Sequence, residues 1–191
     1  KRKGIYLSII LRQTLPPQAL PKLTLFTALS VSRAVEKTTG LSTQIRWPND
    51  LLLNGKKIAG ILTEMSAEQD RVHFVIVGIG LNVNTSPELL PEEATSLRIE
   101  TGEMISRVAL ARSLLEVFDA LYRDFREGNS REALEACRQL SSVLGTHVIV
   151  EQPQGRREGY ALDIDDEGAL LLREDDGVTT RILSGDLVRL R

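Results

Sequence analysis

The feature that most constrains this chain is the pair Asn54-Gly55, which lies between two apolar runs. Both central positions of a two-residue hairpin turn need φ > 0, and Asn-Gly meets that need at little steric cost. The pair therefore predicts a tight β-hairpin in which Leu52 faces Lys57 and Asp50 faces Ala59. Because side chains alternate along a strand, Asp50 and Lys57 then share one face, with Cβ atoms roughly 7–8 Å apart. A carboxylate and an ammonium at this spacing can converge on one ligand.

The polar residues of this hairpin have two interpretations. A Lys and an Asp on a hairpin most often form a solvated face. A ligand site is favoured by Pro48, which lacks an N–H and so marks a bend where the chain enters the strand. It is also favoured by Gly60, because a glycine inside a strand pattern indicates that another group approaches the backbone closely.

A second long apolar strand is predicted over residues 72–83. Its glycines, Gly78 and Gly80, have the same face parity and lack a Cβ, which predicts a smooth furrow where a slender ligand could lie on the sheet. A dinucleotide-binding motif is excluded, because neither a third glycine at the required spacing nor a helix follows. Asn82 and Asn84 continue the same parity, and their amides either end the furrow or simply form a turn at the strand end.

Three motifs carry a family resemblance: Trp47-Pro-Asn-Asp50, Lys57-Ile-Ala-Gly-Ile-Leu62 and Gly78-Ile-Gly-Leu-Asn-Val-Asn84. In order and spacing they resemble the biotin–protein ligases, and the resemblance runs through nearly the whole chain. It implies an enzyme that activates biotin with ATP to biotinyl-5'-AMP and then transfers biotin to a lysine of a biotin carboxyl carrier protein. Two alternatives stay open: a lipoate–protein ligase, and a module that docks a carrier protein without chemistry.

The resemblance also implies roles for individual residues. Lys57 matches the family's essential lysine and is expected at the biotin carboxylate and the α-phosphate. Asp50 is expected to act as general base toward the acceptor lysine, or to help position Mg²⁺. The remaining expected contacts are with the biotin tail and the nucleotide, and Trp47 either frames the pocket or packs as a structural residue. The biotin-tail residues are Gly60, Gly78 and Gly80, and the nucleotide-side residues are Asn49, Asn82 and Trp47.

Two elements of the family pattern are not found in the sequence. The family has a Gly-Arg-Gly-Arg-rich loop and a Ser/Thr-bearing strand, both upstream of the segment that matches residues 5–11. Without them we expect the chain to hold half of the site, to bind biotin poorly by itself and to fall short of full turnover. The family's winged-helix DNA-binding module is not found either, so no nucleic-acid partner is expected for this chain.

The expected fold class is α+β, with a mixed sheet covered by helices, as in the class II synthetase-like catalytic domain of biotin ligases. A buried strand is predicted over residues 5–11, and helices over residues 20–38, 105–125 and 131–144. Residues 86–101 are predicted as a surface loop. Five short alternating strands between residues 147 and 190 predict a small SH3-like β-barrel. We therefore divide the chain into residues 1–144 and 145–191, and in the second part Asp186 is a further residue of interest.

Composition restricts the function classes. A net charge of −2 and a pI near 5.8 argue against a general nucleic-acid binder. No apolar run approaches the ~20 residues of a membrane span, so no membrane partner is expected.

The single cysteine, Cys137, is typical of a reducing compartment and predicts a cytoplasmic protein. His73 and His147 are isolated, so no metal site is expected. The oligomeric state stays open, a homodimer included.

Overall fold

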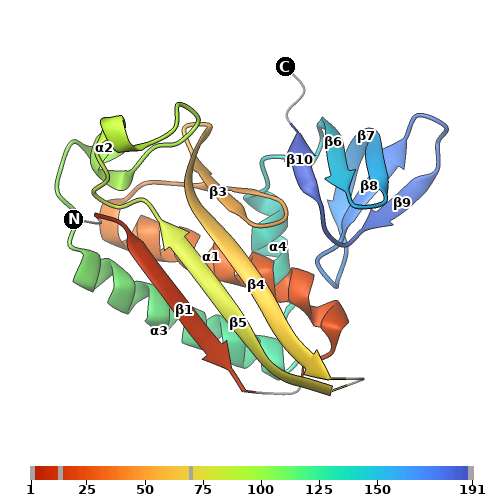
Figure 1. The fold of residues 1–191 in the computed structure, drawn as a ribbon, viewed down its shortest axis with the longest axis horizontal. Helices are drawn as coiled ribbons and strands as arrows, with labels where there is room; N and C mark the ends of the chain where they lie inside the picture. The colour runs from red at the N-terminus through yellow and green to blue at the C-terminus, as the bar shows by residue number, and fades with distance from the viewer. Residues whose placement is uncertain (1–2, 13–14, 69–70, 189–191) are drawn as a thin grey trace.

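The structure is a computed structural model that describes residues 3–12, 15–68 and 71–188. Its larger part is a five-stranded sheet with the strand order β1-β5-β4-β3-β2 (Figure 1). The strands are β1 (Ile5–Leu11), β2 (Gln44–Arg46), β3 (Asp50–Leu53), β4 (Lys56–Glu68) and β5 (Arg71–Leu81). All pairs of these strands are antiparallel. Two isolated bridges, Ile45–Ser141 and Lys57–Ala94, are parallel.

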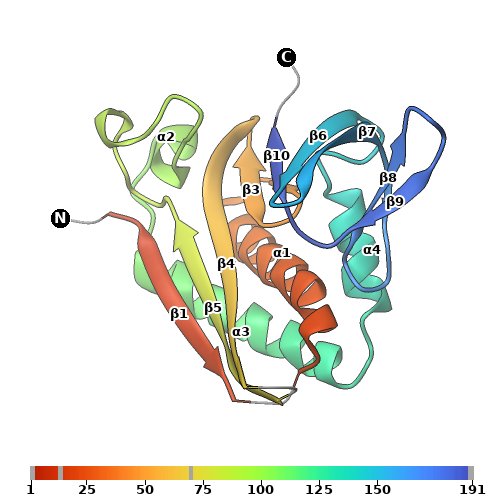
Figure 2. The same ribbon diagram turned by 45° about the vertical axis from the view of Figure 1, so that its right-hand side comes forward.

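Helices α1 (Leu20–Thr39) and α3 (Arg107–Arg126) cover one face of this sheet (Figures 1 and 2). Helix α1 lies against the sheet and is buried almost continuously from Leu23 to Val35. Each fully buried Leu or Phe there contributes roughly 1.5–3 kcal/mol of transfer free energy, so α1 is the centre of the core. It ends at Gly40, whose φ of 73° is the left-handed conformation that a helix C-cap favours. The prediction of a helix over residues 20–38 is confirmed.

Two predictions in the helical region are wrong. The helix predicted over residues 131–144 is shorter, because α4 (Arg131–Gln139) ends where the chain pairs with the sheet edge. Ile45 N donates to Leu140 O at 2.8 Å and Ser142 N donates to Ile45 O at 2.9 Å, and these tertiary bonds replace further helical turns. The loop predicted over residues 86–101 contains η2 (Pro87–Leu89) and α2 (Leu97–Thr101), which Ser96 caps by accepting from Ile99 N. A further short 3-10 helix, η1 (Pro17–Ala19), precedes α1.

The prediction that β1 is a buried strand is also wrong. It is an edge strand, and its residues alternate between half-buried and exposed, with Tyr6 and Ile10 both more than half exposed. Within the described residues no helix covers the second face of the sheet, which points toward the viewer in Figures 1 and 2. That open face is where the candidate site lies.

A second five-stranded antiparallel sheet forms the carboxyl-terminal unit, in the order β10-β6-β7-β8-β9. Its strands are β6 (His147–Gln152), β7 (Gly155–Ile164), β8 (Leu170–Glu174), β9 (Thr179–Ile182) and β10 (Asp186–Val188). The strand predictions for this unit are confirmed over the described residues, and residues 189 and 190 lie outside them. With the helix-covered sheet, this small all-β unit confirms the predicted α+β class.

The β7–β8 turn joins this unit to the larger one. Trp47 Nε1 donates to Gly168 O at 3.1 Å, across a buried contact. Gly168 has a φ of 86°, and a Cβ there would lie 2.7 Å from Lys22 N, so the turn requires glycine on both counts. The turn is therefore seated between α1 and the Trp47 segment.

None of the described helices is both long and apolar enough to cross a membrane.

Candidate functional site

A β-bulge in the β3–β4 hairpin decides which residues meet on the open face. Leu52 is the partner of Lys57, as predicted, but Asp50 is the partner of Gly60, so the predicted Asp50–Ala59 pair is wrong. Ile58 is the extra residue between the Lys57 and Ala59 pairings, and Ala59 itself is buried. A regular strand would send Gly60 to the face opposite Lys57, because side chains alternate. The bulge resets the alternation and brings Asp50, Lys57 and Gly60 together.

Asp50 and Lys57 contact each other directly. The Lys57 ammonium forms an ion pair with Asp50 Oδ1, and Arg46 Nη2 donates to Asp50 Oδ2 at 2.6 Å. The Asp50 side chain is only 11% exposed, against 43% for Lys57 and 33% for Arg46. Oδ1 is shielded from solvent, and its partner is the Lys57 ammonium. The carboxylate is thus the buried centre of the cluster, and the lysine is its most exposed member.

The Lys57 backbone is fixed by the segment that follows β5. Lys57 N donates to Glu93 O at 2.8 Å, and Lys57 O accepts from Thr95 N at 2.9 Å. The side chain therefore extends, on a flexible four-carbon stem, from a backbone held on both sides.

The predicted furrow is present on the open face beside this cluster. Gly60 and Gly80 are partners in the β4–β5 ladder, and Gly78 is the partner of Leu62 two residue pairs further along. A Cβ at Gly60 would lie 3.3 Å from both Lys57 Cε and Lys57 Nζ. An open pocket of about 470 Å³ follows the glycines. It is lined by Tyr6, Leu7, Ser8, Asn49, Asp50, Lys57, Gly60, Ile61, Leu62, Gly78, Ile79 and Gly80.

Of the residues predicted on the nucleotide side, only Asn49 lines this pocket. Its Nδ2 donates to Ile61 O at 3.0 Å, and its own carbonyl accepts from Ile61 N at 2.8 Å, so Asn49 also fixes β4 beside the furrow. Asn82 is just past the end of β5, where its N–H bonds to Ile58 O at 2.8 Å. The structure brings Asn49 to the cluster and leaves Asn82 at the end of β5, beside Ile58 and outside the lining of the pocket.

Trp47 and Asn84 lie away from the furrow. Trp47 is 1% exposed, and its indole N–H is used by Gly168, which matches the structural alternative considered for it. The Asn84 amide bonds Ile105 through both of its ends, so it joins the strand end to the segment before α3. Asp186 begins β10 opposite Glu151 and does not line the furrow pocket.

Sequence reasoning missed three residues of this site: Tyr6, Ser8 and Arg46. The alternation Ile5-Tyr6-Leu7-Ser8 was the available signal for the first two, because polar residues at every second position indicate a strand with one open face. A Cβ at Gly80 would lie 3.9 Å from the Tyr6 ring, so this ring borders the furrow. Arg46 had no signal of its own, since its role depends on the register between β2 and β3.

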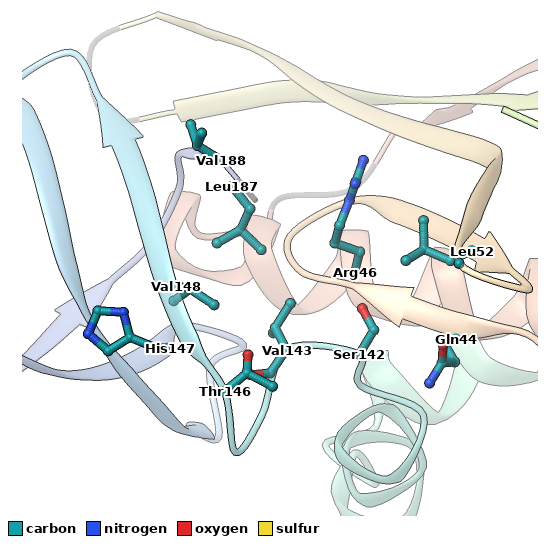
Figure 3. A pocket seen from close by; sticks show the side chains of 11 residues that line it. Gln44, Arg46, Leu52, Ser142, Val143, Thr146, His147, Val148, Leu187 and Val188 are labelled. Atoms are coloured by element: carbon teal, nitrogen blue, oxygen red, sulfur yellow. The ribbon is translucent and has the colours of Figure 1, made fainter. Parts of the chain in front are cut away.

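A second pocket, of about 320 Å³, lies between the β2–β3 hairpin and the carboxyl-terminal unit (Figure 3). Figure 3 shows Arg46 and Leu52 on the hairpin side, with Val148, Leu187 and Val188 on the other side. Arg46 borders this second pocket while its guanidinium bonds Asp50, which lines the furrow. The Arg46–Asp50 pair therefore links the two pockets.

Two other chemistries are not provided by the described residues. Burial raises the pKa of the Cys137 thiol to about 12, which makes it a poor nucleophile. Over residues 3–12, 15–68 and 71–188, no group of three or more His, Cys, Asp or Glu side chains gathers to hold a metal ion.

Two family models match the chain. Residues 1–82 match the Biotin/lipoate A/B protein ligase family, and residues 143–189 match the Biotin protein ligase C terminal domain. The chain is 42% identical over 188 residues to the Bifunctional ligase/repressor BirA of Bacillus subtilis. The aligned region covers 96% of this chain and 58% of the length of that relative. It is 36% identical over 195 residues to the Biotin--[acetyl-CoA-carboxylase] ligase of Mycobacterium tuberculosis, covering 100% of the chain and 71% of that relative.

Solved structures of biotin protein ligases are also similar to this chain. The Biotin protein ligase from Aquifex aeolicus in complex with biotin and ATP superposes with a TM-score of 0.81 at 30% identity, over 98% of this chain and 78% of that one. A second crystal structure of the Aquifex aeolicus protein gives a TM-score of 0.83, also at 30% identity, and covers 98% of this chain and 82% of that one. The match extends over the sheet, its helices and the small carboxyl-terminal unit.

Proposed function

This chain belongs to the biotin protein ligase family, and from that premise we propose that it joins biotin to ATP and passes the biotinyl group to a lysine of a carrier protein. The observation that carries the proposal is the Asp50–Lys57 pair at the end of a glycine-lined furrow. An extended ligand on Gly60, Gly78 and Gly80 would present its carboxylate to the Lys57 ammonium.

We assign the first step, adenylate formation, to Lys57. In this step the biotin carboxylate attacks the α-phosphate of ATP and pyrophosphate leaves, so two anions must approach each other. A fixed positive charge at the forming bond stabilises the transition state more than the separated reactants. The Lys57 ammonium is paired with Asp50 in the structure, and because its side chain is 43% exposed beside the pocket, both anions can reach it.

We assign the second step to Asp50. The acceptor amine must be neutral to attack the mixed anhydride, yet a free lysine is almost wholly protonated at pH 7. A carboxylate next to the anhydride can orient the amine and accept its proton. Asp50 lines the furrow pocket, and its Oδ1, which is paired with the exposed Lys57 ammonium, is the oxygen that would accept the proton.

We place Mg²⁺ on the phosphates of ATP and not in a protein cage. The one carboxylate at the cluster, Asp50, already has a cation on each oxygen, which does not suit it as a metal ligand. When bound, the metal would neutralise phosphate charge, and this chain's part would be to orient the nucleotide.

We further propose that Asn49 and Asn82 contact the nucleotide. Trp47 is buried and has a structural role. The division into residues 1–144 and 145–191 is part of the proposal and is supported by the second family match, which begins at residue 143. We also propose that a carrier protein is the acceptor and that the reaction takes place in the cytoplasm.

The test uses protein expressed from its complete open reading frame. Radiolabelled biotin, ATP and a biotin carboxyl carrier domain should give label on the carrier and release of pyrophosphate. Lipoate in place of biotin should give neither. Label from lipoate would move the assignment to lipoate attachment, and docking of the carrier without label or pyrophosphate would refute catalysis.

The roles of the two steps are separated by Asp50→Asn. This substitution keeps the shape of the side chain but removes its charge and its basicity. Transfer from preformed biotinyl-5'-AMP should slow by about 10²–10⁴-fold, the range typical of general bases. The thermal midpoint must be measured in parallel, because Asp50 also holds Arg46. An unchanged transfer rate would refute the assignment.

A further inference from the structure

Arg46 offers a role at the furrow that the proposed function does not include. It is on β2, opposite Asp50 in the β2–β3 ladder, and its Nη2 donates to Asp50 Oδ2 at 2.6 Å. Lys57 pairs with the other oxygen of the same carboxylate. Two cations therefore share one buried anion, and the three side chains together carry one net positive charge.

We propose that Arg46 is a positioning residue, the permanent counter-ion of Asp50 that frees Lys57 to turn from Asp50 to the anionic groups of the substrates. The inference rests on the proposed role of Lys57. In the structure Lys57 is paired with Asp50, and the same ammonium cannot serve a substrate carboxylate without weakening that pair.

The burial of the three groups favours this division of labour. The Asp50 side chain is 11% exposed, so a departing counter-ion leaves a poorly hydrated charge behind. Removing one partner from a buried ion pair is strongly unfavourable, because an uncompensated charge is left behind. Arg46 stays on Oδ2 and reduces that cost when Lys57 moves.

Both cations extend from a backbone that is held on two sides, so the difference between them lies in their side chains. The backbone of β2 is fixed on both sides, by β3 and by the chain at residues 140–142, through Ile45 N to Leu140 O and Ser142 N to Ile45 O. Figure 3 shows the Arg46 side chain between Leu52 and Leu187 at the second pocket. Lys57 is the more exposed of the two and has a flexible four-carbon stem. Arg46 is therefore the fixed partner, and Lys57 is the one that can turn.

A binding experiment with two substitutions tests this assignment. Biotin affinity is measured by isothermal titration calorimetry on the full-length protein, for wild type, Arg46→Gln and the double variant Arg46→Gln/Asp50→Asn. Arg46→Gln leaves Lys57 and Asp50 as a closed neutral pair, and biotin affinity should fall at least about tenfold. Asp50→Asn should then restore most of that loss, because an uncharged partner no longer holds Lys57.

Three further variants separate positioning from folding and from bulk charge. Arg46→Lys keeps the charge and should bind biotin within about threefold of wild type. Arg157→Gln removes the same charge and also breaks an ion pair, that with Glu174 at 2.7 Å, but lies on the small unit, so its affinity should not change. Lys57→Ala tests the underlying role of Lys57 and should abolish the effect of Arg46→Gln.

The outcomes distinguish this inference from the proposed function. Wild-type affinity in Arg46→Gln, or a double variant no better than Arg46→Gln, would overturn the role of Arg46. If Lys57→Ala itself binds biotin and forms adenylate as wild type does, the proposed function fails first. A loss in Arg46→Gln that Asp50→Asn rescues supports the switch, since a purely structural arginine would give no rescue.

Discussion

Two clusters of ion pairs in this molecule use the same residue types in opposite arrangements. At the furrow one carboxylate, Asp50, lies between two cations, Arg46 and Lys57. On the small unit one guanidinium, Arg181, lies between two carboxylates, Asp165 and Glu167. The first surrounds a buried anion next to an open pocket. The second stabilises a surface turn that contains Asp165 and Glu167.

The two clusters differ in whether one of their members can still bind another group. At the furrow there is an excess of positive charge, and the most exposed member is a lysine with a flexible stem. On the small unit Asp165 also accepts from the backbone N–H groups of Glu167 and Ala169, both at 2.9 Å, so its capacity is used by its own turn. A cluster with unused capacity can serve ligands, and a satisfied one serves the fold.

The largest effect should come from Lys57→Ala. Removing the ammonium takes away the charge at the forming bond, and adenylate formation should fall about 10²–10³-fold, in line with the loss of a group that stabilises developing charge. Pyrophosphate release measures it. The adjacent Lys56→Ala removes an equal charge from an exposed position outside the pocket and should leave the rate unchanged. Equal losses in the two variants would contradict a specific role.

The furrow itself is tested by Gly80→Val. A single methyl at Gly80 would find ordinary contacts, 3.9 Å from Gly60 O and from the Tyr6 ring, but the two further methyl groups of valine would project into the pocket. Biotin affinity should fall at least about tenfold, which corresponds to about 1.4 kcal/mol. Gly80→Ala serves as the graded control and should lose less. Full affinity in Gly80→Val would mean that biotin does not lie on these glycines.

The connection between the two units should respond to Trp47→Phe. Phenylalanine cannot donate to Gly168 O, and an unsatisfied buried acceptor costs about 1–3 kcal/mol. For a chain of this length the thermal midpoint should fall by roughly 3–10 °C. Tyr122→Phe is a matched control, because Tyr122 Oη is buried with no hydrogen-bond partner among the described residues. A drop in Tyr122→Phe as large as that in Trp47→Phe would contradict the hydrogen bond as the cause.

The smallest effect should come from Arg181→Gln, whose ion pairs are largely at the surface. The thermal midpoint should change by no more than about 2 °C, and biotin transfer should be unchanged.

The Arg181 pairs also predict a pH dependence. Partial burial raises the pKa of the Asp165 carboxyl, but the hydrogen bonds from Arg181 and the turn N–H groups outweigh it, so the pKa is lowered from its usual value. A lowered folded-state pKa stabilises the protein above the unfolded pKa of about 3.9 and loses that contribution as the pH falls through the folded value. The difference between wild type and Arg181→Gln should therefore be present at pH 7 and be lost as the pH falls through the lowered pKa of the Asp165 carboxyl. A difference that grows toward low pH would contradict this sign.

Local sequence signals were sufficient for the hairpin, the long strands and the small all-β unit. Asn54-Gly55 fixes its turn because both residues take up positive φ, 52° and 76°. The even spacing of Gly78 and Gly80 predicted a furrow, because their parity depends only on an unbroken strand. The helix before Gly40 was predictable for the same local reason, since a glycine C-cap ends it.

Local signals failed where distant segments compete for the same backbone. Helix α4 stops at Gln139 because the next residues pair with Ile45, nearly a hundred residues earlier in the chain. The edge position of β1, which leaves Tyr6 on the open face, follows from the order of strands in the sheet. No periodicity within either segment contains that information.

By itself the sequence determined the turn, the glycine furrow and the shared face of Asp50 and Lys57, because these depend on backbone preferences and on alternation over a few residues. Only the tertiary structure decided that a bulge at Ile58 puts Gly60 beside Asp50 and Lys57. It alone placed Arg46 on the second carboxylate oxygen and joined Trp47 to Gly168, 121 residues away in sequence. Register shifts and long-range hydrogen bonds depend on how whole elements pack, so no short stretch of sequence fixes them.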